Sequence, residues 1–239
     1  MSARDAGGAR AVRVGVAVPS AGSGQRMGGV RKAFLELAGR PVLEHALRPF
    51  LDEPRVVAVV VALAPDDAAD PPAWLASLDP RVSVVAGGAT RTESVRAAIH
   101  ALPSEVDVIA VHDAARPLVT TDVVARCMDL AAEGVGAVAG CPAVDTMKVV
   151  DPSHTVMDTP DRATLWHAHT PQVFPAAALR AAYATGQEGT DDAALVERWD
   201  PSLPVRLVDD GGTNLKVTRP LDAGLAEAVL ATRSIGTGG

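Results

Sequence analysis

The sequence VRVGVAVPSAGSGQRMGGVRK, residues 12–32, joins an apolar run to a glycine-rich turn. Valine at positions 12, 14, 16 and 18 is typical of a buried β-strand, which Pro19 ends because it lacks a backbone donor. Residues 20–24 are small enough for a ligand to approach backbone N–H groups that can bind an anion. Arg26, Arg31 and Lys32 follow. The stretch therefore predicts a strand leading into a phosphate-binding turn, with an ordinary turn carrying a solvated basic tip as the alternative.

Two well-known phosphate-binding motifs are excluded by the spacing of this turn. A P-loop ends in Gly-Lys-Ser/Thr, which is absent here, and the dinucleotide motif needs a third glycine where Arg26 and Met27 stand. If this turn binds a phosphate, it therefore does so as a motif of another class.

The composition limits the class of protein. The 239 residues are 48% hydrophobic but only 3% aromatic, which predicts a core of Ala, Val and Leu. A net charge of −7 argues against nucleic-acid binding through a general positive field, so a phosphate ligand must be held by local cations. Cys127 and Cys141 suggest neither a disulfide framework nor a cysteine-based metal site. No run reaches the length of a membrane span, and we expect a soluble cytoplasmic protein.

Strand-like and helical patterns alternate along the chain. We expect strands at 12–18, 56–63, 82–86, 106–111, 135–144, 165–174 and 203–208, with a further short strand at 214–217. We expect helices at 41–51, 74–78, 90–102, 121–133, 175–183, 191–199 and 220–232. This alternation predicts an α/β fold with a mostly parallel sheet, helices on both faces and ligands at the C-terminal strand ends.

The domain boundaries follow from the same pattern. Residues 12–232 are expected to form one domain, between a flexible leader at 1–11 and a flexible tail at 233–239. The stretch 145–162 is polar and too long for a turn, and a loop of that length is usually functional or disordered.

Two motifs follow predicted strands. In Gly87-Gly88-Ala89-Thr90-Arg91 with Ser94, paired glycines precede a helix N-terminus that could bind an anion, or Thr90 and Glu93 simply form a capping box. In His112-Asp113-Ala114-Ala115-Arg116-Pro117, the carboxylate could help to hold a metal–triphosphate complex while the arginine meets a phosphate. A structural Asp–Arg pair is the alternative for this motif.

Further motifs lie in the C-terminal half. Asp145-Thr146-Met147-Lys148 and Asp161-Arg162 place cations at both ends of the 145–162 stretch, where a solvated loop is the alternative. His167 and His169 point to one face of a strand, but no third metal ligand is evident, and packed histidines are the expectation. Lys216 and Thr218 share one face of an extended segment before Pro220. No nucleophile elbow or Ser-His-Asp order is present, so cations, hydroxyls, glycines and one strand-end aspartate favour nucleotidyl transfer.

Six segments in series, PSAGSGQRM, GGATRTESV, VHDAARP, DTMK, LWHAHTPQVF and NLKVTRPLD, resemble the 2-C-methyl-D-erythritol 4-phosphate cytidylyltransferase family over about residues 14–230. The resemblance implies a Rossmann-like nucleotidyltransferase fold that carries out the CTP-dependent step of the non-mevalonate isoprenoid pathway. It also implies a homodimer, with residues 145–162 as a protruding dimerisation arm, and Mg²⁺ or another divalent cation.

The resemblance also implies roles for individual residues. The catalytic cations would be Arg26, Lys32 and Lys216. The nucleotide would be bound by Ala21, Gly22, Gly24, Gly88, Ser94, Asp113 and Ala114, with Asp113 also near the metal and the CTP phosphates. The acceptor 2-C-methyl-D-erythritol 4-phosphate would be bound by Arg116, Thr146, Arg162, Thr170 and Thr218, some of them from the partner subunit.

Two alternatives to this activity remain open from the sequence. A cytidylyltransferase acting on another polyol phosphate, such as ribitol 5-phosphate, would share much of the same pattern. A nucleotide-binding protein that has lost turnover is the alternative from another class. Such a protein would have no need of cations at the transferred phosphorus.

Overall fold

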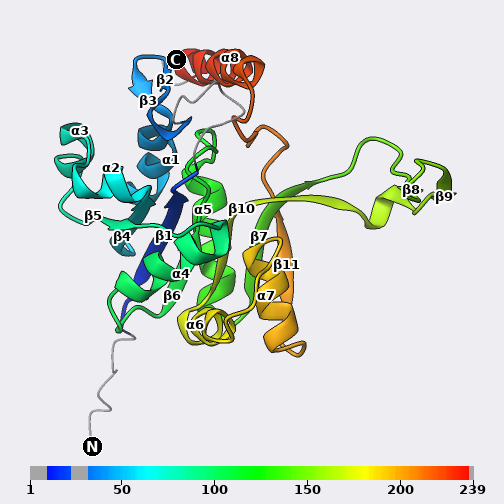
Figure 1. Cartoon of the computed structure of the whole chain (residues 1–239), viewed down its shortest axis with the longest axis horizontal. Helices are drawn as coiled ribbons and strands as arrows, with labels where there is room; N and C mark the ends of the chain where they lie inside the picture. Colours follow the sequence, from blue (N-terminus) through cyan, green and yellow to red (C-terminus); the bar gives the residue numbers. More distant parts are fainter. Residues whose placement is uncertain (1–9, 23–31, 237–239) are drawn as a thin grey trace, which may run out of the picture.

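A computed structural model describes residues 10–22 and 32–236, which form a central sheet covered by helices (Figure 1). The sheet has seven strands in the order β11-β7-β10-β6-β1-β4-β5. These are β1 (Val14–Ser20), β4 (Val56–Leu63), β5 (Val82–Ala86), β6 (Val108–Val111), β7 (Gly136–Pro142), β10 (Trp166–Pro175) and β11 (Val205–Asp209). All neighbouring strands are parallel except that β10 runs antiparallel to both β6 and β7. The predicted mostly parallel sheet is therefore confirmed.

The central strand β1 shows why both faces of the sheet are covered. Val14, Val16 and Val18 enter one core cluster, whereas Ala17 enters the other, because successive side chains of a strand point to opposite faces. Apolar residues of α1 (Val42–Leu51) and α5 (Thr121–Ala132) join the first cluster. Those of α4 (Arg91–Ala101), α6 (Ala176–Ala184) and α7 (Asp192–Trp199) join the second. The sheet is thus buried on both faces, as its continuous apolar strands require.

A smaller layer lies beyond one end of the sheet. The hairpin of β2 (Glu36–Leu37) and β3 (Arg40–Pro41) packs beside the C-terminal helix α8 (Pro220–Gly236), drawn in red in Figure 1. Leu37, Val42 and Ala226 share a separate apolar cluster there. This layer connects α8 to the segment that precedes α1.

An arm extends away from the body of the molecule between β7 and β10 (Figure 1). Its tip is a hairpin of β8 (Val149–Val150) and β9 (Val156–Asp158), and η3 (Arg162–Thr164) lies near its return to the sheet. Apolar side chains are exposed along it, including Val144, Met147, Val149, Val150, Val156 and Met157. The arm spans the same stretch that the sequence marks as an unusually long excursion.

Two local expectations differ from the structure. The expected strand at 214–217 does not form: the Asn214 carbonyl accepts from Arg116, and Val217 N–H donates to the Ala115 carbonyl instead of a strand partner. The acidic segment after β4 contains a short helix, α2 (Pro65–Ala69), that was not expected, ahead of α3 (Ala73–Ala76). None of the described helices is both long and apolar enough to cross a bilayer.

Candidate functional site

A cavity of about 550 Å³ opens at the C-terminal ends of β1, β5 and β6. Ser20, Ala21 and Gly22 border it after β1, and Gly88 and Ser94 border it from the turn into α4. Asp113, Ala114, Ala115, Arg91 and Lys216 contribute further lining. The cavity therefore lies where parallel α/β sheets bind their ligands, and its size is that of a small-molecule site.

The turn before α4 is held by local side chains. Thr90 Oγ1 accepts from Glu93 N–H at 3.1 Å, and Thr90 N–H donates to Glu93 Oε2 at 3.1 Å, which confirms the capping box. Ser94 Oγ accepts from Gly88 N–H at 3.2 Å. A Cβ on Gly88 would collide with the Glu93 side chain, so the turn needs a glycine there to stay this close to the helix.

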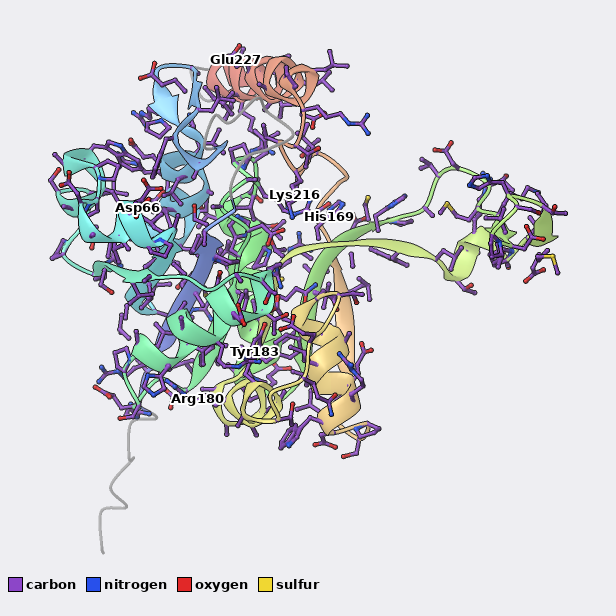
Figure 2. All side chains as sticks on the ribbon, viewed as in Figure 1. Asp66, His169, Arg180, Tyr183, Lys216 and Glu227 are labelled. Carbon is purple, nitrogen blue, oxygen red and sulfur yellow. The ribbon has the colours of Figure 1, made fainter. Side chains whose placement is uncertain are left out.

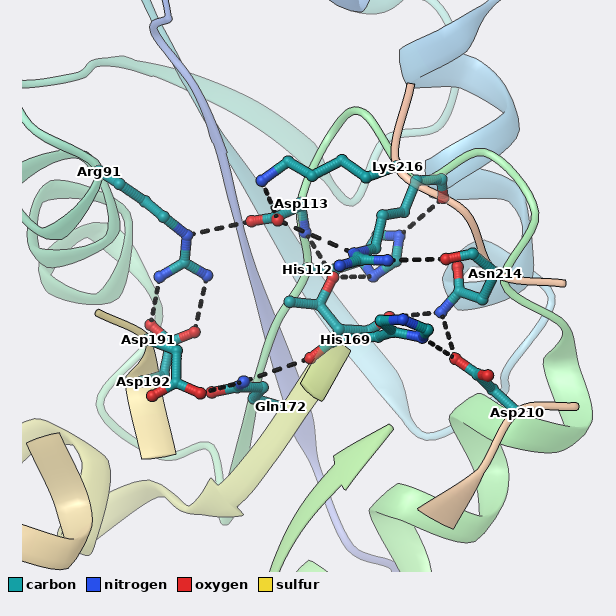
Figure 3. A network of polar contacts seen from close by, with 12 residues as sticks. Arg91, His112, Asp113, His169, Gln172, Asp191, Asp192, Asp210, Asn214 and Lys216 are labelled. Carbon is teal, nitrogen blue, oxygen red and sulfur yellow. Dashed lines mark hydrogen bonds and ion pairs between the residues drawn. The ribbon is translucent and has the colours of Figure 1, made fainter. Parts of the chain in front are cut away.

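Asp113 is the centre of an ion-pair network that Figure 3 shows. Its Oδ2 lies 2.7 Å from Lys216 Nζ, and its Oδ1 lies 3.0 Å from Arg91 Nε. Burial by itself would raise the pKa of the Asp113 carboxyl, but the positive charges of Arg91 and Lys216 outweigh it and hold that pKa well below its usual range. A fixed carboxylate thus holds two cations at the cavity wall.

Arg91 is anchored from its other side. Its two terminal nitrogens donate to Asp192 at 3.1 and 2.8 Å, and the buried Asp192 also accepts from the Tyr183 hydroxyl. A planar guanidinium held in this bidentate manner has little rotational freedom. The network therefore fixes Arg91. The Lys216 side chain is 42% exposed, and among the described residues its ion pair is with Asp113 alone.

A second chain of hydrogen bonds sets the backbone around Asp113. Asp113 N–H donates to Thr170 Oγ1 at 3.0 Å, and that hydroxyl lies 3.1 Å from His112 Nδ1. His112 Nε2 lies 3.1 Å from the Arg116 carbonyl, which can only accept, so Nε2 carries the proton and Nδ1 accepts from Thr170. Burial lowers the pKa of His112 to about 4, and the neutral imidazole is retained at neutral pH.

Most of the expected residues fall into three groups by position. Those that line the cavity are Ala21, Gly22, Gly88, Ser94, Asp113, Ala114 and Lys216. Arg26 and Gly24 lie outside the described residues, and Lys32 begins η2 (Lys32–Phe34), with its side chain outside the described part. Arg116 and Thr170 are buried beside Asp113. The structure thus brings all of the described nucleotide-binding candidates to one place.

The other expected acceptor residues lie elsewhere in this chain. Thr146 and Arg162 are on the exposed arm, where Arg162 donates to the Val144 carbonyl at 2.8 Å. Thr218 Oγ1 donates to Asp222 Oδ2 at 2.8 Å at the beginning of α8. Lys216 lies two residues before it, in the segment between β11 and α8 (Figure 2). Unlike Lys216, the side chains of Thr146, Arg162 and Thr218 do not line the cavity.

Comparison with known proteins gives a consistent result. Residues 14–232 match the model of the 2-C-methyl-D-erythritol 4-phosphate cytidylyltransferase family. The chain belongs to this family. It is 46% identical over 224 residues to the protein of that name from Symbiobacterium thermophilum, covering 92% of this chain and 93% of the relative. It is 43% identical over 239 residues to the one from Streptomyces coelicolor, covering 95% and 88%.

Solved structures agree with this family membership. The crystal structure of 2-C-methyl-D-erythritol 4-phosphate cytidylyltransferase from Thermus thermophilus is similar with a TM-score of 0.75 and 35% identity, covering 91% of this chain and 98% of that one. The 4-diphosphocytidyl-2C-methyl-D-erythritol synthase of Anaerococcus prevotii gives a TM-score of 0.83 at 25% identity, covering 92% and 97%. The Rossmann-like cytidylyltransferase fold expected from the sequence is confirmed.

Sequence reasoning missed part of the network in this cytidylyltransferase fold. Arg91 was noticed only as the end of a glycine-rich motif, and Asp192 was not singled out. A cation that directly follows a helix N-cap was the available signal for Arg91. No local signal marks Asp192, because its partner is 101 residues away in the sequence.

Proposed function

We propose that this chain transfers CMP from CTP to 2-C-methyl-D-erythritol 4-phosphate, with release of pyrophosphate. The product is 4-diphosphocytidyl-2-C-methyl-D-erythritol. Membership of the cytidylyltransferase family supports the reaction. The observation that carries it at the level of chemistry is Lys216, held by Asp113 at 2.7 Å on the wall of a nucleotide-sized cavity.

The small residues of the cavity fit the nucleoside part of CTP. Ala21, Gly22 and Gly88 leave backbone groups accessible, as close recognition of a base and ribose requires. A Cβ on Gly87 would lie 2.6 Å from Ala21 Cβ and 2.9 Å from Ser94 Oγ, so the two turns already approach each other as closely as their side chains permit. We assign the base and ribose to this end of the cavity, with Asp113 and Ala114 at the ribose and phosphate region.

The chemistry is an in-line displacement. An oxygen of the acceptor 4-phosphate attacks the α-phosphorus of CTP, a new P–O bond forms, and the bond to the bridging oxygen of the leaving pyrophosphate breaks. The acceptor phosphate is already ionised near neutral pH, so no general base is needed. Negative charge accumulates around the α-phosphorus, and the proposed role of Lys216, Arg26 and Lys32 is to stabilise it.

A divalent cation such as Mg²⁺ fits one part of this site. Mg²⁺ is usually held by one or two carboxylates together with substrate phosphates. Asp113 offers one carboxylate at the cavity, and in the part of the chain that the structure describes it belongs to no cluster of three or more metal ligands. These residues fit an ion held mainly by the triphosphate, which would neutralise phosphate charge when bound.

The acceptor phosphate is assigned to Arg116. Its side chain is buried, Nη1 donates to the Asn214 carbonyl at 2.7 Å, and Nε has no hydrogen-bond partner among the described residues. Nε lies 3.9 Å from Asp113 Oδ2, on the side of the ion-pair network. An unpartnered buried guanidinium N–H is costly unless a ligand completes it, and an anionic acceptor would do so.

Two further acceptor contacts, Thr146 and Arg162, are assigned to a partner subunit. Thr146 and Arg162 lie on an arm that projects from the body, and its exposed apolar side chains suit burial against a second copy. In a homodimer with exchanged arms, each arm would bring these residues to the partner's cavity. Mass measurement by light scattering tests this proposal, since a particle of 24.5 kDa would contradict it.

The direct test of activity is pyrophosphate release with CTP, Mg²⁺ and 2-C-methyl-D-erythritol 4-phosphate. Ribitol 5-phosphate replaces the acceptor in one control, and UTP and ATP replace CTP in others. Release that requires CTP and the methylerythritol phosphate is expected. Release only with ribitol 5-phosphate would keep the mechanism but change the acceptor, and binding of CTP without release in any mixture would refute the catalytic assignment.

A further inference from the structure

Three potential metal ligands come together from three neighbouring strands of the sheet. Cys141 is the penultimate residue of β7, His169 lies within β10, and Asp210 directly follows β11. One ligand atom of each lies within 4.8 Å of the others. The cluster is apart from Asp113 and is not part of the cavity lining, and the proposed reaction does not use it.

The sheet explains this convergence. Strand β7 lies between β10 and β11, with Asp209 in register with Gly140, so Asp210 lies next to Cys141. The pairing of β10 with β7 is interrupted between Ala168 and Gln172, and His169 lies in that interruption. A sequence pattern cannot show this arrangement, since the three residues are separated by 28 and 41 positions. Of the two histidines in this segment only His169 belongs to the cluster, and its two companions come from other strands.

We propose that Cys141, His169 and Asp210 bind a divalent transition-metal ion of the zinc class. The thiolate, imidazole and carboxylate form the mixed donor set that Zn²⁺ and Co²⁺ accept, whereas Mg²⁺ prefers oxygen ligands alone. Metal–ligand distances of about 2.0 to 2.3 Å place the ligands of a tetrahedral site roughly 3.5 Å apart. The present spacing needs only small side-chain adjustments to reach that geometry, and water would complete the fourth position.

Asp210 is held from outside the cluster by Asn214 and Gly212, and it also contacts His169, a second ligand of the cluster. The Asp210 side chain is 1% exposed, and its Oδ2 lies 2.7 Å from His169 Nδ1 and 3.1 Å from Asn214 Nδ2 (Figure 3). Its Oδ1 accepts from Gly212 N–H at 3.0 Å. Outer hydrogen bonds of this kind orient metal ligands and commonly affect affinity about 10- to 100-fold. Carboxylate and thiolate together would balance the charge of a divalent ion at this half-buried position.

Metal binding at this site must displace a proton. Burial raises the pKa of the Cys141 thiol, so the free protein carries a neutral thiol near pH 7. On binding, the sulfur–hydrogen bond is replaced by a sulfur–metal bond and the proton passes to the buffer. The ion would join the ends of β7, β10 and β11 through one centre. It would also lie next to Asn214, which donates to the Thr170 carbonyl at 2.8 Å.

The test is a Co²⁺ titration of the full chain in excess Mg²⁺, followed by absorption spectroscopy. One equivalent is expected to produce a thiolate-to-cobalt charge-transfer band and the visible spectrum of a tetrahedral ion. Cys141→Ser should abolish the charge-transfer band, and His169→Gln should weaken binding by at least about 10- to 100-fold. Zn²⁺ should then displace Co²⁺ with loss of the colour.

Matched variants separate the site from incidental binding. Cys127→Ala removes the other thiol, which is buried in α5, and His167→Gln removes an exposed histidine two residues from His169. Both should keep the one-equivalent spectrum. A band that persists in Cys141→Ser, equal weakening by the two histidine variants, or no thiolate band at one equivalent would overturn the proposal and leave the His169–Asp210 contact as a structural pair.

Discussion

Replacing Lys216 by alanine should separate catalysis from stability. The side chain lines the cavity and is 42% exposed, so its ion pair with Asp113 should contribute at most about 1 kcal/mol to folding. Asp113 would keep Arg91 at 3.0 Å, which limits the cost of leaving that buried carboxylate. Loss of the proposed contact to the transferred phosphate should instead lower kcat roughly 10²- to 10³-fold, equivalent to about 3 to 4 kcal/mol of transition-state stabilisation.

The assay is steady-state pyrophosphate release at saturating CTP and acceptor, beside urea unfolding of the same preparations. Arg219→Ala is the matched control, because it removes an exposed cation three residues further along the same segment. The kcat of this control should stay within about twofold of that of the unaltered chain, because a surface substitution usually changes free energies by only a few tenths of a kcal/mol. A near-normal kcat for Lys216→Ala, or a loss that only follows unfolding, would refute the reasoning.

Three further predictions concern the rest of the fold and site. Lys32→Ala should lower kcat by a similar factor of roughly 10²- to 10³-fold with urea unfolding unchanged, and near-normal turnover in both lysine variants would refute the catalytic assignment. Folding lowers the pKa of His112 from 6.5 to about 4, so between these pH values only the unfolded chain takes up this proton. The free energy of unfolding should therefore decrease as the pH is lowered through this range. Urea unfolding measures how much free energy of unfolding is lost between pH 7 and pH 5. That loss should be about 2 kcal/mol smaller in His112→Gln than in His100→Gln, which changes an exposed histidine as the control. Equal losses in the two variants would contradict the prediction. Gly140→Ala should destabilise the fold by about 1 to 3 kcal/mol, because the added Cβ would meet a backbone carbonyl of β10. Gly224→Ala, on the open face of α8, should instead stabilise the fold by about 0.5 to 1 kcal/mol. Thermal unfolding of both variants measures these changes.

The strand-end chemistry could be predicted from the sequence because it depends on local order. The run 12–18 with its glycine turn, and the strand that ends before His112 and Asp113, each show a change from apolar to polar residues. In a parallel sheet such ends meet at one edge, so Ala21 and Asp113 were expected to be close, and both line the cavity. The family resemblance added the expectation that Lys216 joins them.

The partners of these residues could not be predicted, because they depend on long-range packing. Lys216 and Asp113 are 103 residues apart, and no periodicity shows that Asp192 fixes Arg91 from the opposite side. The expected strand at 214–217 was wrong for a related reason. Its apolar and β-branched residues suit a strand. In the structure, however, backbone groups of this segment form hydrogen bonds with Ala115 and Arg116 instead of with a neighbouring strand.

The ion pairs around Asp113 suggest how an acidic protein binds a triphosphate. With a net charge of −7 the chain cannot attract CTP through its overall field, so cations must be concentrated at the site. Cations gathered without a ligand would repel one another, and Asp113 reduces that repulsion by holding Lys216 and Arg91. When a phosphate arrives, Lys216 can exchange the carboxylate for it. Arg91 can stay in place, because Asp192 still binds it, and Asp113 then remains paired. Among the described residues Lys216 is held by one carboxylate and Arg91 by two, so Lys216 is the better placed of the two cations to follow the phosphate through the reaction.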